Sequence, residues 1–249
     1  MVVLKTRREL EVMREACRIS AGALDLIGRA VEPGVTTAEL DRIAEQYILK
    51  EGGTPNFKNY QGYPATACIS INHEVIHGIP NKKRVLKTGD IVSVDLGAKF
   101  GGYNGDNAAT FAVGDISPDA KRLIDTTRQS LYEGIKMARA GGRIGDISAT
   151  IQQYVEARGY SVVRDFVGHG IGTNLHEAPE VPNFGTLGRG VRLLPGMTIA
   201  IEPMVNAGGS QVKVMPDGWT VLTKDGSLSA HFEHTVAITA EGPQIMTTL

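Results

Sequence analysis

Two pairs of amphipathic helices, recurring at a fixed distance, constrain the fold of this chain more than any other feature of its sequence. The first predicted helix carries apolar residues at helical spacing from Leu10 to Ile27 and ends before Pro33-Gly34. The next begins with a capping box of Thr36 and Glu39 and ends at the following glycine pair. Because each helix has one apolar face, both must cover something larger.

The second helix pair lies 107 residues further along the chain. Its first helix has Ser117 as the N-cap and Pro118 in the first turn, and its second runs from Ile144 to Gly159. The repeat predicts a duplicated unit of two helices followed by strands. A shift of 107 residues places Leu24 on Leu131, Gly34 on Gly141, Gln46 on Gln153, Tyr47 on Tyr154 and Gly52 on Gly159.

Apolar segments bounded by glycine or proline turns predict six strands. Because the helices come in pairs and most strands in hairpins, the sequence predicts an α+β fold with helices on one face of an antiparallel sheet. No linker-like segment separates the two halves, so residues 1–249 are expected to form a single domain. The predicted strands cover residues 67–71, 90–98, 108–113, 197–201, 219–223 and 231–239.

Charge and cysteine content exclude several classes of function. The 26 Lys and Arg nearly balance the 27 Asp and Glu, which gives no electrostatic case for nucleic acid or an anionic membrane as a partner. With only Cys17 and Cys68, a disulfide framework is excluded. No stretch approaches the ~20 apolar residues of a membrane span, and the start lacks a secretory apolar region. We therefore expect a cytoplasmic protein.

Two aspartates are expected to face the same space. Asp95 lies in the alternating segment 91–97, and if Gly101-Gly102 is a two-residue hairpin loop, Asp106 lies opposite Gly97. The carboxylates are then diagonal neighbours, about 7–8 Å apart at the backbone. They repel each other unless a cation or proton lies between them. The alternative is that Asp106 belongs to an Asn-Gly-Asp turn and that Asp95 is simply polar.

Three further residues are candidates for a metal site with these aspartates. His169 lies among glycines in residues 168–172, where no neighbouring side chain obstructs a ligand. Glu202 ends an apolar run and is held extended by Pro203, and Glu233 lies in a largely apolar strand. Taken singly, each is equally compatible with a structural histidine or half of a salt bridge. Together, carboxylates and one imidazole suit divalent ions and could hold two of them about 3.5–4 Å apart around a hydroxide.

At these motifs the sequence resembles the methionine aminopeptidase family in its short bacterial type I form. The resemblance extends over the whole chain, through RELEVMREACRISA, YQGYPATACISINHEVIHGIP and HGIGTNLHEAP. It implies the pita-bread fold, in which two related halves enclose the metals. It also implies removal of the initiator methionine from nascent proteins with a small second residue. The residues that resemble the five metal ligands of the family are Asp95, Asp106, His169 in GHGIG, Glu202 in IEP and Glu233 in FEHT.

The resemblance implies a role for each of these ligands. Asp95 binds one ion, His169 and Glu202 bind the other, and Asp106 and Glu233 bridge the two. A hydroxide shared by the ions attacks the carbonyl after methionine, with the metals as Lewis acids. The sequence leaves open whether the two divalent ions are Co, Mn, Fe, Ni or Zn.

The resemblance also implies residues that handle the substrate. Glu202 shuttles a proton from the nucleophile, His176 hydrogen-bonds the oxyanion or the next peptide group, and His77 contacts the scissile amide. An apolar, sulfur-tolerant pocket suits the thioether of methionine. The walls of this pocket are expected from Tyr60, Tyr63, Cys68, His77, Leu175 and Trp219.

Three positions depart from the family pattern. Leu175 stands where an aromatic residue is often found, and Asn107 stands where threonine is common. His231 stands where glutamine is common, and we expect it to be a surface histidine, the alternatives being an imidazole that tunes the site or binds a stray metal.

Two other functions compete with this interpretation. An X-Pro peptidase shares the fold but usually carries a large N-terminal domain, whereas here the catalytic domain is expected to start almost at Met1. A metal-free binding protein of the same fold would have substituted ligands, and all five are present. For the favoured enzyme, the expected partners are nascent polypeptide N-termini and the ribosome near its exit tunnel, and the resemblance favours a monomer.

Overall fold

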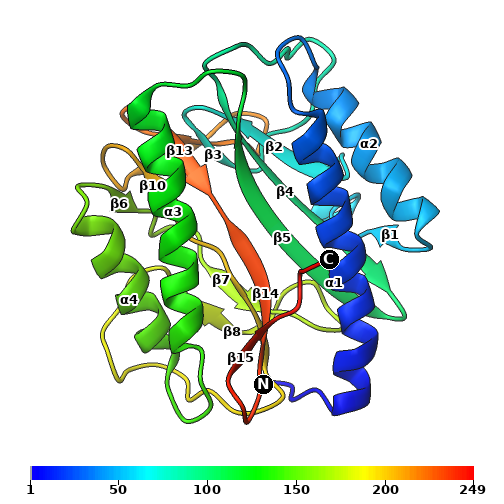
Figure 1. The fold of residues 1–249 in the computed structure, drawn as a ribbon, viewed down its shortest axis with the longest axis vertical. Coiled ribbons are helices and arrows are strands. Elements are labelled where there is room, and N and C mark those ends of the chain that lie inside the picture. Colours follow the sequence, from blue (N-terminus) through cyan, green and yellow to red (C-terminus); the bar gives the residue numbers. More distant parts are fainter. Residues whose placement is uncertain (1) are drawn as a thin grey trace.

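Four α-helices lie on one face of a large sheet in the computed structural model, which describes residues 2–249 (Figure 1). Helix α1 (Arg7–Ala30) and helix α2 (Thr37–Lys50) cover one half of the sheet. Helix α3 (Pro118–Met137) and helix α4 (Ile144–Glu156) cover the other half. The predicted α+β fold with paired helices is confirmed. Within the described residues, none of the helices is long and apolar enough to cross a membrane.

The helix boundaries repeat as the sequence predicts. Helix α2 begins at Thr37 and α4 begins at Ile144, while α1 ends at Ala30 and α3 ends at Met137, so both offsets are the predicted 107 residues. Each helix pair has its own core cluster, one beneath α1 and α2 and one beneath α3 and α4. The chain therefore consists of two similar halves.

Side-chain caps fix where these helices begin. The capping box predicted at Thr36 is present, with the Thr36 hydroxyl accepting from the backbone of Glu39. The Ser117 hydroxyl caps α3 as predicted. A second box at Thr6, which the sequence analysis did not identify, begins α1.

The large sheet is antiparallel and joins the two halves. Its strand order is β1-β4-β5-β14-β9-β7-β8, with β2 added beside β4 and β15 beside β14. Two small three-stranded sheets, β13-β10-β6 and β11-β12-β3, complete the fold. The bounds are β1 Thr54–Pro55, β2 Ala67–Ile71, β3 Glu74–Ile76, β4 Ile91–Phe100, β5 Tyr103–Ala112, β6 Ser161–Val162, β7 Gly168–Gly170, β8 Glu177–Val181, β9 Thr198–Ile201, β10 Met204–Asn206, β11 Val212–Val214, β12 Val221–Thr223, β13 Ser229–His231, β14 Glu233–Ile238 and β15 Pro243–Ile245.

The β4–β5 hairpin has the predicted register. Gly101 and Gly102 form its turn with φ of 57° and 88°, values in the left-handed region that favours glycine. Gly97 pairs with Asp106, which places Asp95 and Asp106 on the same face. Asp106 lies within β5, so the alternative of an Asn-Gly-Asp turn is wrong.

Several strands differ from the prediction. The segment 231–239 is two strands, since β13 pairs with β10 while β14 pairs with β5 and β9, and Phe232 lies between them. The strand predicted at 219–223 begins two residues later, at Val221. The glycine-rich strand β7, which carries His169, was not predicted, because glycine is uncommon in strands.

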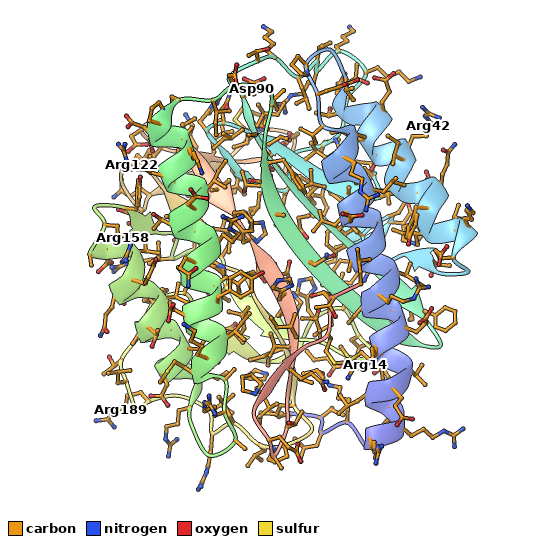
Figure 2. All side chains as sticks on the ribbon, viewed as in Figure 1. Arg14, Arg42, Asp90, Arg122, Arg158 and Arg189 are labelled. Carbon is orange, nitrogen blue, oxygen red and sulfur yellow. The ribbon has the colours of Figure 1, made fainter. Side chains whose placement is uncertain are left out.

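Charged side chains lie on the outside of this assembly. Figure 2 shows Arg42, Arg122 and Arg189 pointing away from the ribbon. The apolar residues of the two core clusters lie between the helices and the sheet. Asp106, His169 and Glu233 of the candidate site are among the exceptions, because they lie buried among the strands.

Candidate metal centre and substrate pocket

Five neighbouring strands of the large sheet each supply one candidate ligand. In sheet order, β4 carries Asp95, β5 carries Asp106, β14 carries Glu233, β9 ends just before Glu202, and β7 carries His169. All five side chains line a single cavity of about 250 Å³. The structure therefore brings together residues that are up to 138 positions apart in the sequence, from Asp95 to Glu233.

The ligand atoms lie close to one another. The Nε2 of His169 is 3.6 Å from Oε1 of Glu202 and 4.0 Å from Oδ2 of Asp106. One ligand atom from each of Asp106, His169 and Glu233 lies within 4.8 Å of the others. Such a cluster of anionic oxygens and one imidazole is a donor set for divalent ions.

The backbone orients the His169 ring for metal binding. Its Nδ1 lies 2.9 Å from the carbonyl oxygen of Gly170 and therefore donates to it. The other nitrogen, Nε2, is left without a proton and faces the carboxylates. This is the arrangement of a metal-ligating histidine, in which a second hydrogen bond fixes the tautomer. Burial lowers the pKa of His169 to about 3, which keeps the ring neutral.

The carboxylates themselves indicate that a cation belongs among them. Within residues 2–249, buried oxygens of Asp95, Asp106 and Glu233 have no hydrogen-bond partner. Burial, reinforced by repulsion between the groups, raises the pKa of Asp106, Glu202 and Glu233 well above the ordinary range. Burial also raises the pKa of Asp95 to about 8. Bound cations would satisfy these oxygens and offset the repulsion, so the residues present fit the metal centre that the sequence predicts.

His231 is not the surface histidine that we expected. Its exposed fraction is 1%, and its Nε2 lies 3.8 Å from Oε2 of Glu202. Burial lowers the pKa of His231 to about 3, so the ring is neutral. The prediction was wrong because β13 pairs with β10 and places this residue inside the fold.

The predicted pocket residues all line the same cavity as the metal ligands. Tyr63 packs edge-on against Trp219 at a ring separation of 5.1 Å, and Cys68 lies buried beside them. Leu175 is buried in a neighbouring apolar cluster. Sequence reasoning missed two lining residues, Phe57 and Gln61. The lining also includes Tyr60, His77 and His176.

Two histidines of the cavity lining, His77 and His176, have distinctive local geometry. His77 follows β3 with a φ of 59°, a left-handed conformation that is uncommon for a non-glycine residue and typical of strained functional positions. His176 hydrogen-bonds to the hydroxyl of Tyr60, with Nδ1 2.8 Å from that oxygen. The next residue, Glu177, accepts a hydrogen bond from Lys5 at 2.6 Å, and both side chains are buried, which anchors the loop that carries His176.

Asn107 points away from the cavity. Its side-chain oxygen accepts a hydrogen bond from the hydroxyl of Ser20 on α1. Alternation along β5 explains this orientation, because the preceding residue, Asp106, faces the cavity. The difference from the family pattern at Asn107 therefore affects the packing of α1 on the sheet.

The architecture and the carboxylate–imidazole cluster define a metal-dependent hydrolase. The sequence model of "Metallopeptidase family M24" matches residues 11–240. Methionine aminopeptidase from Clostridium acetobutylicum is 55% identical, and methionine aminopeptidase 1 from Bacillus subtilis is 52% identical, each over 99% of both chains. The chain belongs to metallopeptidase family M24 and, within it, to the methionine aminopeptidases.

Solved structures agree with this assignment. Methionine aminopeptidase from Thermotoga maritima superimposes with a TM-score of 0.99 at 46% identity, with 100% of both chains covered. Prolidase from Pyrococcus furiosus has a TM-score of 0.79 at 24% identity, and 66% of its chain is covered, which shows the shared fold alone. The pita-bread fold and the family resemblance inferred from the sequence are thus confirmed.

Proposed function

We propose that this chain removes the N-terminal methionine from polypeptides whose second residue is small. One observation carries the proposal: five metal-ligand side chains and an apolar pocket containing Cys68 and Trp219 line the same cavity. The high identity to methionine aminopeptidases over the full chain supports the same activity.

Two divalent ions, from among Co, Mn, Fe, Ni and Zn, are the proposed cofactors. Asp95, Asp106, His169, Glu202 and Glu233 would together hold these ions. When bound, the ions supply Lewis acidity toward the scissile carbonyl and the attacking water.

The remaining chemistry belongs to side chains of the chain itself. We assign proton transfer to Glu202, because its carboxylate lines the cavity and lies 3.6 Å from the His169 ring. The neutral rings of His77 and His176 provide hydrogen bonds to the substrate's peptide groups. Burial lowers the pKa of His77 to about 4 and also lowers that of His176, so both rings are neutral at pH 7.

The pocket selects the first residue by shape and polarity. Tyr63 uses its hydroxyl to donate to backbone carbonyls of Ala67 and Gly78, at 3.0 and 3.1 Å, so only its ring faces the cavity. Together with Cys68 and Trp219, it forms an apolar wall suited to a flexible thioether.

The cellular setting follows from the proposed activity. Nascent polypeptide N-termini are the proposed substrates, which places the protein in the cytoplasm and near the ribosomal exit tunnel. We propose that it acts as a monomer.

A peptide panel tests the proposed specificity. Metal-free protein would be reloaded with Mn(II) or Co(II) and assayed with Met-Ala-Ser, Met-Leu-Ser and Ala-Pro-Ser, beside the Asp106→Asn variant. We expect methionine release from Met-Ala-Ser, at least ~10-fold less from Met-Leu-Ser, and none from the variant. Preference for Ala-Pro-Ser would instead indicate an X-Pro peptidase, and turnover of no peptide with any metal would indicate a binding protein.

A further inference from the structure

His231 is a buried side chain that neither the ligand set nor the pocket accounts for. Its exposed fraction is 1%, and neither ring nitrogen has a hydrogen-bond partner within residues 2–249. An unpaired buried polar group is unfavourable, so its retention calls for an explanation. The Nε2 of His231 lies 3.8 Å from Oε2 of Glu202.

The backbone of His231 is held from two sides. Its N–H donates to the hydroxyl oxygen of Thr110 at 2.8 Å, and that hydroxyl donates back to the His231 carbonyl at 2.9 Å. In the strand pairing of β13 with β10, His231 lies opposite Met204, two residues after Glu202. The hydrogen bonds to Thr110 and the pairing with β10 therefore fix the Cα position of His231.

The two oxygens of Glu202 face two different imidazoles. Oε1 lies 3.6 Å from Nε2 of His169, and Oε2 lies 3.8 Å from Nε2 of His231. His169 already donates its Nδ1 proton to Gly170, so its Nε2 has no proton to give. Of these two rings, only His231 can therefore supply an N–H to Glu202.

We propose that His231 is a positioning residue for Glu202: its ring donates an Nε2–H hydrogen bond to Oε2 and leaves Oε1 to face His169. The inference rests on the proposed function, in which Glu202 carries the proton. The separation of 3.8 Å closes to hydrogen-bond length by a shift of less than ~1 Å.

Three variants test the kinetic role. His231→Leu keeps a side chain of similar bulk but removes the donor, His231→Gln keeps an N–H donor, and the exposed His73→Leu is the matched control. On Met-Ala-Ser we expect His231→Leu to lower kcat by ~10–100-fold with little change in KM, and His231→Gln to stay within ~5-fold of wild type. The control should match wild type. Equal kcat values for His231→Leu and wild type would overturn the proposal, as would equal losses in the Leu and Gln variants.

Two further measurements do not depend on turnover. In metal-free and Zn(II)-loaded protein labelled with ¹⁵N-histidine, we expect a slowly exchanging Nε2 proton on His231 that shifts upfield in Glu202→Ala. Absence of that proton, or an unchanged shift in Glu202→Ala, would refute the hydrogen bond.

Calorimetry should find that His231→Leu binds the same number of Mn(II) ions as wild type, whereas loss of one ion would make His231 a ligand instead. If the wild-type protein releases no methionine, the proposed function is wrong. The Nε2 proton resonance still shows whether His231 donates a hydrogen bond to Glu202.

Discussion

Replacing Asp95 by asparagine should stabilise the metal-free protein near neutral pH, although it removes a proposed ligand. Burial raises the pKa of Asp95 to about 8 in the folded protein, against an ordinary value of 3.8. Between these two pH values the folded state holds a proton that the unfolded state has released. The free energy of unfolding therefore falls as pH rises through this window.

The magnitude follows from the size of the window. One bound proton changes the free energy of unfolding by about 1.4 kcal/mol per pH unit. Between pH 3.8 and pH 7, the Asp95 carboxyl therefore lowers the free energy of unfolding by on the order of 4 kcal/mol. The asparagine side chain does not ionise, so the Asp95→Asn variant lacks this dependence on pH. Buried histidines such as His169, whose pKa is lowered to about 3, contribute the opposite slope below about pH 6.5, but they are shared by both proteins and cancel in the comparison.

Urea unfolding of EDTA-treated protein at pH 5, 6, 7 and 8 measures the effect. We expect the free energy of unfolding of Asp95→Asn, relative to that of wild type, to rise by about 1.4 kcal/mol per pH unit up to about pH 8. The exposed Asp115→Asn is the control and should follow wild type at every pH. Parallel curves for wild type and Asp95→Asn would refute the argument, because they would show that the Asp95 carboxylate ionises in the fold without penalty.

Three further predictions follow from the geometry. His169→Asn should weaken Mn(II) binding at least ~100-fold by calorimetry, because it removes the imidazole from the carboxylate cluster, and unchanged affinity would exclude His169 as a ligand. Trp219→Ala should raise KM for Met-Ala-Ser ~10-fold while Mn(II) affinity stays constant, because the ring lines the pocket and is not a ligand; a kcat loss at constant KM would contradict this assignment. Gly105→Ala should destabilise the protein by about 1–3 kcal/mol in thermal unfolding, because the added Cβ would lie 2.5 Å from the Cα of Cys17 on α1. An unchanged melting temperature would show that α1 can move away from β5 without cost.

Local sequence rules predicted the helices and the placement of two of the five candidate ligands. Helical periodicity and the cap at Thr36 fixed where the helices lie, since both depend on residues only three or four positions apart. The glycine turn and strand alternation were likewise sufficient to place Asp95 and Asp106 on one face. Their roles as ligands remain predictions that await metal-binding measurements.

Long-range pairing was beyond these rules. The order β4-β5-β14-β9-β7, which brings His169, Glu202 and Glu233 beside the aspartates, depends on contacts between distant segments. The chemistry of the side chains suggested these residues as candidates for one metal site, but only the family resemblance implied that the fold brings them together. The burial of His231 was missed for the same reason, because it depends on pairing with β10 and on Thr110 of β5.

Metal titration with simultaneous readout of occupancy and turnover tests the central claim most directly. Metal-free protein would receive Mn(II) in steps, with bound metal measured by elemental analysis and methionine release measured from Met-Ala-Ser, beside Asp106→Asn. We predict no release without metal, release that rises with occupancy to a plateau at no more than two ions per chain, and loss of both binding and release in the variant. Full methionine release by the metal-free protein, or by Asp106→Asn, would contradict the account.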